Sequence, residues 1–318
     1  MSPVSLSGAS PTVVVALRNP EATIAWTQAL ARELPEARVI ADEPHAPNAD
    51  YAVIWKQAPG FFARQPKLRA AFAAGAGVDW LFADAELPAA LAVYRIEDAG
   101  MAQQMTAYCC HEVLRLHYGY DRYEAQQREG LWRELAYRSP RDRTIGVFGL
   151  GILGSAIAKT LAGFGFAVRG FSRSPKSLAG IETFDERQGL RRFLENCDVL
   201  VIAAPSTAHT RDLFNAERLA WLAPGAHVIN VARGELLVED DLLADLDSGR
   251  LGGATLDVFR AEPLPPDNPL WRHRSVRITP HIAAITVIAE SARQVAQRIV
   301  ALRGGESPGG LVRRERAY

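Results

Sequence analysis

The sequence of 318 residues predicts an α/β fold built from two halves, each containing a parallel β-sheet. Apolar runs rich in Val and Ile alternate with helical patterns along the chain, which is typical of parallel sheets. A pattern of strand, glycine-rich turn and helix begins near the middle, at Thr144, so a separate unit precedes it. The length also suits two domains of ordinary size. We therefore expect a two-domain chain.

The first half is expected to hold three strands and two helical segments. A helix is expected from Glu21 to Leu34, because Pro20 suits the start of a helix. The segment Pro66–Ala74 also has helical character and stops at Gly75. The predicted strands are Thr12–Leu17, Ala37–Ile40 and Tyr51–Trp55.

A long helical pattern, Met101–Glu129, joins the two halves. Such a helix could bridge the domains or pack against a partner subunit. Burial in the chain's own core is at least as consistent with the pattern, because a helix in a globular protein usually turns its apolar stripe toward the core. Both alternatives stay open at this level.

A glycine-rich turn follows the apolar run Thr144–Phe148 and reads Gly149-Leu150-Gly151-Ile152-Leu153-Gly154. Gly149 permits a sharp turn, Gly151 lets the backbone approach a pyrophosphate, and Gly154 lets helix and strand pack closely. The free N–H groups at the start of the following helix, Ser155–Ala162, favour an anion. The spacing therefore predicts a dinucleotide site, although glycines also recur in ordinary loops.

The rest of the second half supplies the strands of such a site. After the glycine turn the predicted strands are Ala167–Phe171, Asp198–Ala203, His227–Val231, Ala254–Val258 and Val276–Thr279. With Thr144–Phe148 they make the six strands of a dinucleotide-binding sheet. A further helix is expected at Ala289–Arg303.

The end of the second cofactor strand distinguishes NADPH from NADH. NAD sites usually place an acidic residue there, where it binds the ribose 2′-hydroxyl. This chain has Ser172-Arg173-Ser174 instead, followed by Lys176. Two hydroxyls and a guanidinium suit a 2′-phosphate, which a carboxylate would repel. We expect NADPH; the alternative is a polar surface loop that merely lacks an acid.

Charge and cysteine usage narrow the class of protein. The 36 basic and 36 acidic residues balance, which does not indicate nucleic acid or an anionic membrane as partner. No apolar run reaches the length of a membrane span, and Met1–Ser5 lacks the pattern of a signal peptide. Cys109, Cys110 and Cys197 have neither metal-ligand nor CxxC spacing. We expect a cytoplasmic protein with reduced thiols and no metal.

Three residues with complementary chemistry follow strands of the same predicted sheet: Arg233, Glu262 and His281. Functional residues in open parallel sheets lie beyond the carboxyl ends of the strands. Arg suits a substrate carboxylate and carbonyl, His suits proton transfer near neutral pH, and a carboxylate beside His favours the imidazolium. This set fits hydride transfer to a 2-oxo acid. Each residue alone has a structural explanation, and the combination carries the prediction.

The ordered motifs resemble the D-isomer-specific 2-hydroxyacid dehydrogenase family, and within it the glyoxylate/hydroxypyruvate reductase A type. Several motifs occur in the family's order from the first domain to the C-terminus, which makes the resemblance specific. One departure is Ser172, which stands where the family usually has an acid and fits its NADPH-using branch. The matching segments are Gly75–Asp79, Glu97–Met101, Gly149–Gly154, Phe171–Ser174, Asn230–Gly234, Leu256–Phe259, Glu262–Pro265, Thr279–Ala283, Gly304–Glu306 and Gly310–Val312.

The resemblance implies the fold and the roles of individual residues. It implies two Rossmann-like doubly wound domains with a cleft between them: a split substrate domain, residues 1–100 plus 285–318, and a dinucleotide-binding domain, residues 101–284. It implies a homodimer with the 101–129 helix at the interface. The residue roles that it implies are Arg233 on the substrate, His281 as acid/base with Glu262 orienting it, Asp257 near the nicotinamide carboxamide, Pro205 at the cofactor, and backbone N–H groups of Ala76, Gly77 and Val78 on the substrate carboxylate.

Trp55 matches a substrate-pocket aromatic of this type, and a packed core Trp is the equal alternative. The resemblance further implies NADPH-dependent reduction of small 2-oxo acids, glyoxylate and hydroxypyruvate first, to 2-hydroxy acids. Two other functions stay open: a dehydrogenase for a larger 2-keto acid such as 2-ketogluconate, and a non-catalytic cofactor-sensing protein.

Overall fold

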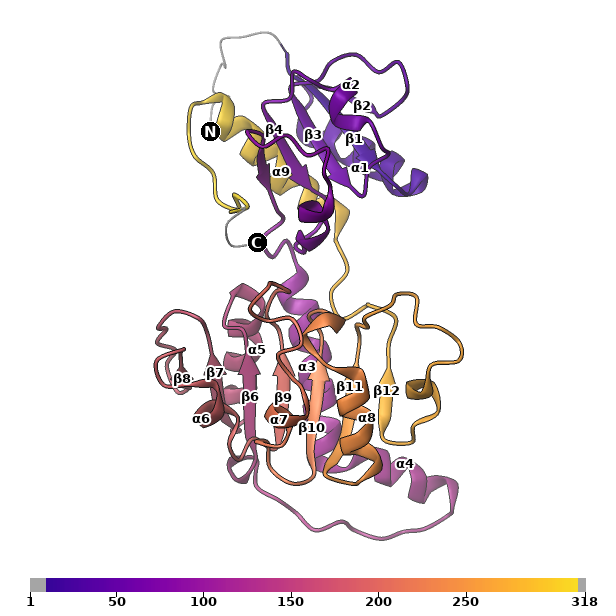
Figure 1. The fold of residues 1–318 in the computed structure, drawn as a ribbon, viewed down its shortest axis with the longest axis vertical. Helices are drawn as coiled ribbons and strands as arrows, with labels where there is room; N and C mark the ends of the chain where they lie inside the picture. The colour runs from indigo at the N-terminus through magenta and orange to yellow at the C-terminus, as the bar shows by residue number, and fades with distance from the viewer. Residues whose placement is uncertain (1–9, 314–318) are drawn as a thin grey trace. The chain divides into compact units, whose positions relative to one another are not determined.

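The computed structural model describes residues 10–313, apart from the side chains of Phe82 and Ala83, so Met1–Ser5 lies outside the described residues (Figure 1). The chain divides into two units, Met1–Gly100 with Thr286–Tyr318, and Met101–Ile285. Each unit has a sheet in which all strand pairs are parallel. The predicted α/β fold with two parallel sheets is therefore confirmed.

The first unit contains a five-stranded sheet in the order β2-β1-β3-β4-β5. Its helices include α1 (Pro20–Glu33), α2 (Phe61–Arg64), the 3-10 helix η1 (Asp79–Ala83) and α9 (Ile288–Arg303), which packs against α1 (Figure 1). The Asn19 side chain caps α1 by accepting from the Ala22 N–H at 3.1 Å. The strands are β1 (Thr12–Leu17), β2 (Arg38–Ala41), β3 (Tyr51–Trp55), β4 (Ala70–Ala73) and β5 (Ala92–Tyr94).

The helical interpretation of Pro66–Ala74 is wrong, because Ala70–Ala73 forms strand β4. Alanine favours helices in isolation, but β4 pairs with β3 on one side and β5 on the other, and all four residues are buried. Burial between two neighbouring strands therefore outweighs the local preference. Strand β5 was not predicted.

The second unit contains a seven-stranded sheet in the order β12-β11-β10-β9-β6-β7-β8. The direction of the strand order reverses between β6 and β9, the place where doubly wound sheets bind ligands. The six predicted strands are present, and the short β8 is an addition that was missed. The strands are β6 (Thr144–Phe148), β7 (Ala167–Phe171), β8 (Glu182–Phe184), β9 (Val199–Ile202), β10 (Ala226–Asn230), β11 (Leu251–Leu256) and β12 (Val276–Ile278).

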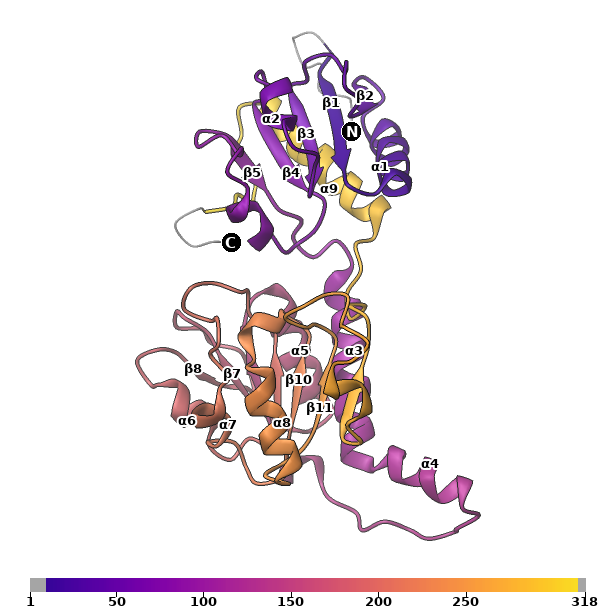
Figure 2. The same cartoon turned by 45° about the vertical axis from the view of Figure 1, so that its right-hand side comes forward.

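Helices cover both faces of this sheet (Figures 1 and 2). On one face, α3 (Met101–Tyr118) and α5 (Ile152–Gly163) enclose a core that includes Ile145, Val201 and Ile229. The opposite core includes Phe193, Leu200 and Val228. The helices on that side are α6 (Leu190–Leu194), α7 (Ala216–Leu219) and α8 (Glu239–Asp247).

The predicted single helix Met101–Glu129 is two helices, because the chain breaks at Gly119. Gly119 has φ +66°, a left-handed conformation that glycine adopts without steric cost. Helix α4 (Tyr120–Arg128) then leads away from the sheet of this unit (Figures 1 and 2).

A chain of buried hydrogen bonds joins α3 to the sheet. His227 Nε2 lies 3.0 Å from Thr255 Oγ1, and Thr255 donates to Glu112 Oε2 at 2.9 Å. Since the Thr255 proton goes to the carboxylate, His227 donates through Nε2–H. Arg115 lies 3.2 Å from the same carboxylate oxygen. Burial, followed by the charges of Arg115, Arg143 and Arg277, lowers the pKa of His227 to about 3.

The lowered pKa of His227 predicts a loss of stability in mild acid. The unfolded imidazole has a pKa of about 6.5 and binds a proton first, so stability falls as the pH drops below this value toward about 3. His227 should contribute a loss of about 2 kcal/mol in the free energy of unfolding between pH 7 and pH 5. Urea unfolding at pH 7 and at pH 5 measures this change in the free energy of unfolding.

His227→Gln provides the control, because an amide keeps an N–H donor for Thr255 and does not titrate. The variant should lose less stability than the wild type between pH 7 and pH 5. Equal losses in the two proteins would contradict the assigned role of His227.

Candidate active site

The glycine turn after β6 has the geometry that a dinucleotide site needs. Gly149 has φ +104°, and a Cβ there would lie 2.7 Å from the backbone N of Ala204. A Cβ at Gly154 would lie 1.8 Å from the Gly149 carbonyl oxygen. Both glycines are therefore required by the fold itself, through close packing of turn, strand and helix.

Gly151 differs, since a Cβ there would meet nothing within 4 Å. It is exposed and is the N-cap of the 12-residue helix α5. The free space beside Gly151 therefore adjoins the first N–H groups of that helix. Ile152 is also exposed, and Leu153 is partly buried against the α3–α5 core. The turn thus offers space and backbone donors for a pyrophosphate.

The segment after β7 is polar and exposed. Ser172 donates its hydroxyl to the Ser174 carbonyl at 2.7 Å, which closes a tight turn around Arg173. The Lys176 ammonium donates to the Leu150 carbonyl, so its charge lies against the glycine turn. Hydroxyls and two cations therefore gather at the end of β7 beside the turn, a composition that suits a phosphate monoester.

Pro205 lies in the segment after β9, the strand next to β6 in the sheet. It is exposed, and its carbonyl accepts from the Thr210 hydroxyl at 2.7 Å. The segments that carry the glycine turn and Pro205 therefore leave neighbouring strands at the same edge of the sheet.

Arg233 follows β10 and is held by Asn230. The Asn230 side chain is fully buried; it accepts from the Ala232 N–H at 3.1 Å and donates to the Arg233 carbonyl at 2.9 Å. A Cβ on Gly234 would lie 2.0 Å from the Phe259 carbonyl carbon, so this turn packs directly on the loop after β11. Asn230 had no predicted role, although a polar residue at the end of an apolar strand was the available signal.

Glu262 and His281 form the central pair of the site. His281 Nδ1 lies 2.8 Å from Glu262 Oε2, and Glu262 Oε1 accepts from the Phe259 N–H at 3.0 Å. Because a carboxylate only accepts, it favours the imidazole form with the proton on Nδ1. The His281 side chain is 44% exposed, so the ring is accessible. The structure therefore brings these two predicted residues together.

Asp257 organises the turn that carries His281. It is 1% exposed, and its carboxylate accepts from the Ile282 and Ala283 N–H groups, both at 2.8 Å, and from the Thr279 hydroxyl at 2.6 Å. Its backbone carbonyl accepts from the His281 N–H at 2.8 Å. The carboxylate that was expected near a nicotinamide thus has a structural function in this turn.

Apart from Arg233, the predicted substrate residues lie in the first unit. Trp55 ends β3 and packs edge-on to Trp80, with ring centroids 5.3 Å apart. A Cβ on Gly75 would lie 2.8 Å from the Trp55 ring, so the ring covers the start of the segment Ala76-Gly77-Val78. Val78 is buried, whereas Ala76 and Gly77 are half-buried. Trp55 also lines a hollow of about 700 Å³ with Arg18 and Lys56.

A membrane-spanning helix would need a longer apolar stretch than any helix within residues 10–313 provides. The same residues contain no group of three or more His, Cys, Asp or Glu side chains placed to hold a metal ion. All three cysteines are buried free thiols.

Comparison with known proteins gives consistent matches. The family model described as D-isomer specific 2-hydroxyacid dehydrogenase, NAD binding domain, matches residues 110–283. The glyoxylate/hydroxypyruvate reductase A of Serratia proteamaculans (strain 568) is 43% identical over 293 residues, which cover 90% of this chain and 94% of that protein.

Solved structures agree with these matches. The D-isomer specific 2-hydroxyacid dehydrogenase from Xanthobacter autotrophicus Py2, in complex with NADPH and MES, has a TM-score of 0.92 and 39% identity, covering 98% of this chain and 100% of that chain. The NADPH-dependent glyoxylate/hydroxypyruvate reductase from Sinorhizobium meliloti, in complex with NADP and sulfate, has a TM-score of 0.90 and 36% identity. The match covers 97% of this chain and 100% of that chain. The chain therefore belongs to the D-isomer specific 2-hydroxyacid dehydrogenase family, as its ordered motifs predicted.

Proposed function

We propose that this protein reduces small 2-oxo acids, glyoxylate and hydroxypyruvate first, to 2-hydroxy acids with NADPH. The hydrogen-bonded pair His281–Glu262 carries the proposal, because it joins the loop after β11 to the turn after β12 in the sheet that also bears the glycine turn. The relatives from Serratia and Sinorhizobium are named glyoxylate/hydroxypyruvate reductases, and the Xanthobacter relative was solved with NADPH. These names support the substrate class and the cofactor.

In this proposal His281 is the proton donor. A bound NADPH would supply the hydride for the C2 carbonyl. Glu262 accepts the hydrogen bond from Nδ1–H, which leaves Nε2 as the nitrogen that would donate its proton to the substrate oxygen. Arg233 binds the substrate carboxylate and polarises the carbonyl, since guanidinium pairs well with carboxylates and stays charged.

The cofactor assignments follow the same chemistry. The pyrophosphate would be bound by backbone N–H groups at the start of α5, at Gly151, Ile152 and Leu153. The 2′-phosphate would be bound by Ser172, Arg173 and Ser174. The remaining assigned cofactor residues are Gly149, Gly154, Pro205 and Asp257.

We further propose that residues 1–100 plus 285–318 form the substrate domain and that residues 101–284 form the dinucleotide-binding domain. Within the substrate domain, Ala76, Gly77 and Val78 would donate backbone N–H groups to the substrate carboxylate. The Trp55 ring would limit the size of the substrate, because a bulky aromatic beside the segment after Gly75 leaves less room for a longer chain. This proposal favours small 2-oxo acids over sugar acids.

The proposal predicts that His281→Ala lowers kcat for glyoxylate by about 100-fold or more, the usual contribution of a positioned acid. The dissociation constant for NADPH should change less than threefold. NADPH oxidation with glyoxylate, hydroxypyruvate, pyruvate and 2-ketogluconate, together with fluorescence titration of NADPH, measures both quantities.

The substrate panel separates the alternatives. Turnover only with 2-ketogluconate would keep the mechanism and replace the substrate class. Failure of the wild-type protein to reduce any of the four acids with NADPH or NADH would refute the proposed reaction and favour a cofactor-sensing role.

Arg173→Ala should raise the KM for NADPH by about tenfold or more, because charge-assisted hydrogen bonds to the 2′-phosphate are lost. The KM for NADH should stay within about twofold, since NADH lacks this phosphate. Arg192→Ala on α6 is a matched control, because it removes another exposed arginine of the same unit. An equal effect of Arg173→Ala on both cofactors would refute the 2′-phosphate assignment.

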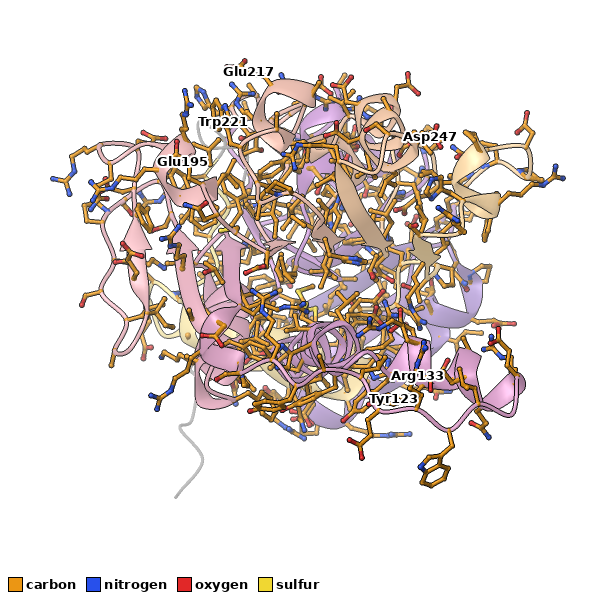
Figure 3. All side chains as sticks on the ribbon, turned by 90° about the horizontal axis from the view of Figure 1, so that it is seen from below. Tyr123, Arg133, Glu195, Glu217, Trp221 and Asp247 are labelled. Atoms are coloured by element: carbon orange, nitrogen blue, oxygen red, sulfur yellow. The ribbon has the colours of Figure 1, made fainter. Side chains whose placement is uncertain are left out.

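We also propose that the protein is a cytoplasmic homodimer. Free buried thiols fit a reducing compartment. Residues 120–139, here called the arm, comprise α4 and an irregular segment that folds back through a hydrogen bond from the Leu135 N–H to the Tyr123 hydroxyl. Figure 3 shows Tyr123 and Arg133 of the arm at one edge of the view.

The arm exposes apolar side chains that a second copy would cover. Trp132 is 99% exposed and Tyr137 is 79% exposed. Large apolar side chains that are exposed on one segment are candidates for an interaction site. The remaining exposed large apolar residues of the arm are Tyr120, Tyr123 and Leu131.

Trp132→Lys should convert the dimer to monomer at micromolar concentration. A tryptophan that becomes buried against a partner is a frequent anchor of interfaces. Light scattering coupled to size-exclusion chromatography gives the mass. Ile24→Lys, at an exposed residue of α1, is the control and should remain a dimer. A wild-type monomer, or a dimeric Trp132→Lys protein, would refute the interface.

A further inference from the structure

Three polar residues lie one turn apart on α3 and face the strands and the turn that carry the candidate site. The Gln104 amide donates to the Ile285 carbonyl at 3.1 Å and accepts from the Ile285 N–H at 3.2 Å. The Tyr108 hydroxyl lies 2.7 Å from Thr279 Oγ1. Glu112 accepts from Thr255 on β11. Spacings of four residues place these side chains along one helical stripe.

The direction of the Tyr108–Thr279 bond follows from its next neighbour. Thr279 donates its only hydroxyl proton to Asp257 Oδ1 at 2.6 Å. Tyr108 must therefore donate to Thr279 Oγ1. Burial raises the pKa of Tyr108 to about 12, so the phenol keeps this proton throughout the ordinary pH range. The result is a directed chain from Tyr108 through Thr279 to Asp257.

This chain ends on the carboxylate that shapes the turn at His281. Asp257 holds the backbone N–H groups of Ile282 and Ala283, and its carbonyl holds the N–H of His281. His281 has φ +57°, a left-handed conformation that costs free energy for a residue with a Cβ. Such a conformation persists only where surrounding contacts enforce it.

We propose that Tyr108 is a positioning residue for the proton donor. Its hydroxyl fixes the Thr279 rotamer, Thr279 fixes the Asp257 carboxylate, and Asp257 holds the His281 backbone so that the ring meets Glu262. Gln104 secures the same segment at Ile285, four residues beyond His281. Tyr108 does not touch the reacting atoms in this proposal. The catalytic consequence rests on the function proposed above, whereas the effect on the turn does not.

The first test measures the turn itself, without substrate. Hydrogen–deuterium exchange in Tyr108→Phe should accelerate by about fivefold or more at the Ile282 and Ala283 amides. Loss of one hydrogen bond from the series Tyr108–Thr279–Asp257 should raise the opening equilibrium of the turn by roughly this factor. Tyr118→Phe, on the same helix and exposed, is the matched control and should leave these amides unchanged. Unchanged exchange in Tyr108→Phe would overturn the positioning role, whatever the activity.

The second test measures turnover. Thr279→Val and Tyr108→Phe should each lower kcat for glyoxylate by about tenfold, while the KM for glyoxylate and for NADPH stays within twofold. The solvent deuterium isotope effect on kcat should rise, because proton transfer becomes slower. Thr279→Ser keeps the hydroxyl and should restore kcat. The double variant should be no slower than Thr279→Val, since both substitutions interrupt one chain.

The combined outcomes separate the two proposals. The exchange in Tyr108→Phe could be faster while the wild-type protein reduces no 2-oxo acid. That result would refute the proposed function, but the proposal that Tyr108 positions the turn would stand. Faster exchange with unchanged kcat in an active enzyme would refute the catalytic consequence. A KM that rises as much as kcat falls would indicate general damage to the site and would also overturn the proposal.

Discussion

The buried carboxylate of Asp257 is the interaction on which the rest of the candidate site depends. It accepts three hydrogen bonds from the segment Thr279–Ala283, and so ties the end of β11 to the turn after β12. Without these bonds the left-handed backbone of His281 would have little to hold it. The Glu262–His281 pair then forms because the loops after two neighbouring parallel strands leave the sheet at the same edge.

The second unit uses the same arrangement twice on the α3 side of the sheet. A ring donor meets a threonine hydroxyl, which in turn donates to a buried carboxylate: His227–Thr255–Glu112 and Tyr108–Thr279–Asp257. A threonine between donor and acceptor satisfies both groups, which matters because an unpaired buried polar atom is costly. Glu112 also has Arg115 beside it, whereas Asp257 is satisfied by backbone N–H groups. The first series of hydrogen bonds therefore joins α3 to the sheet, and the second joins α3 to the turn that carries His281.

The sequence predicted those parts of the fold and site that depend on local patterns. The glycine spacing, the strands that precede Arg233, Glu262 and His281, and the Glu262–His281 pairing are such parts, because parallel strands bring their carboxyl ends to one edge. Strand β4 could not be predicted, since the run Ala70–Ala73 acquires its strand conformation from neighbours distant in sequence. The break at Gly119 and the role of Asn230, by contrast, have local causes that were overlooked: a glycine in a left-handed conformation, and an amide that bonds to the backbone two and three residues further on.

The three glycines of the cofactor turn show how structural demand and functional demand can be separated in one motif. Gly149 and Gly154 leave no room for a Cβ against the protein's own backbone, so the fold alone accounts for them. Gly151 meets no protein atom within 4 Å of an added Cβ, so packing gives no reason for glycine there. The cofactor proposed above would supply the missing reason, since a side chain at this point would stand between its pyrophosphate and the first N–H groups of α5. A glycine with free space beside it is therefore a stronger signal of function than a glycine that close packing requires.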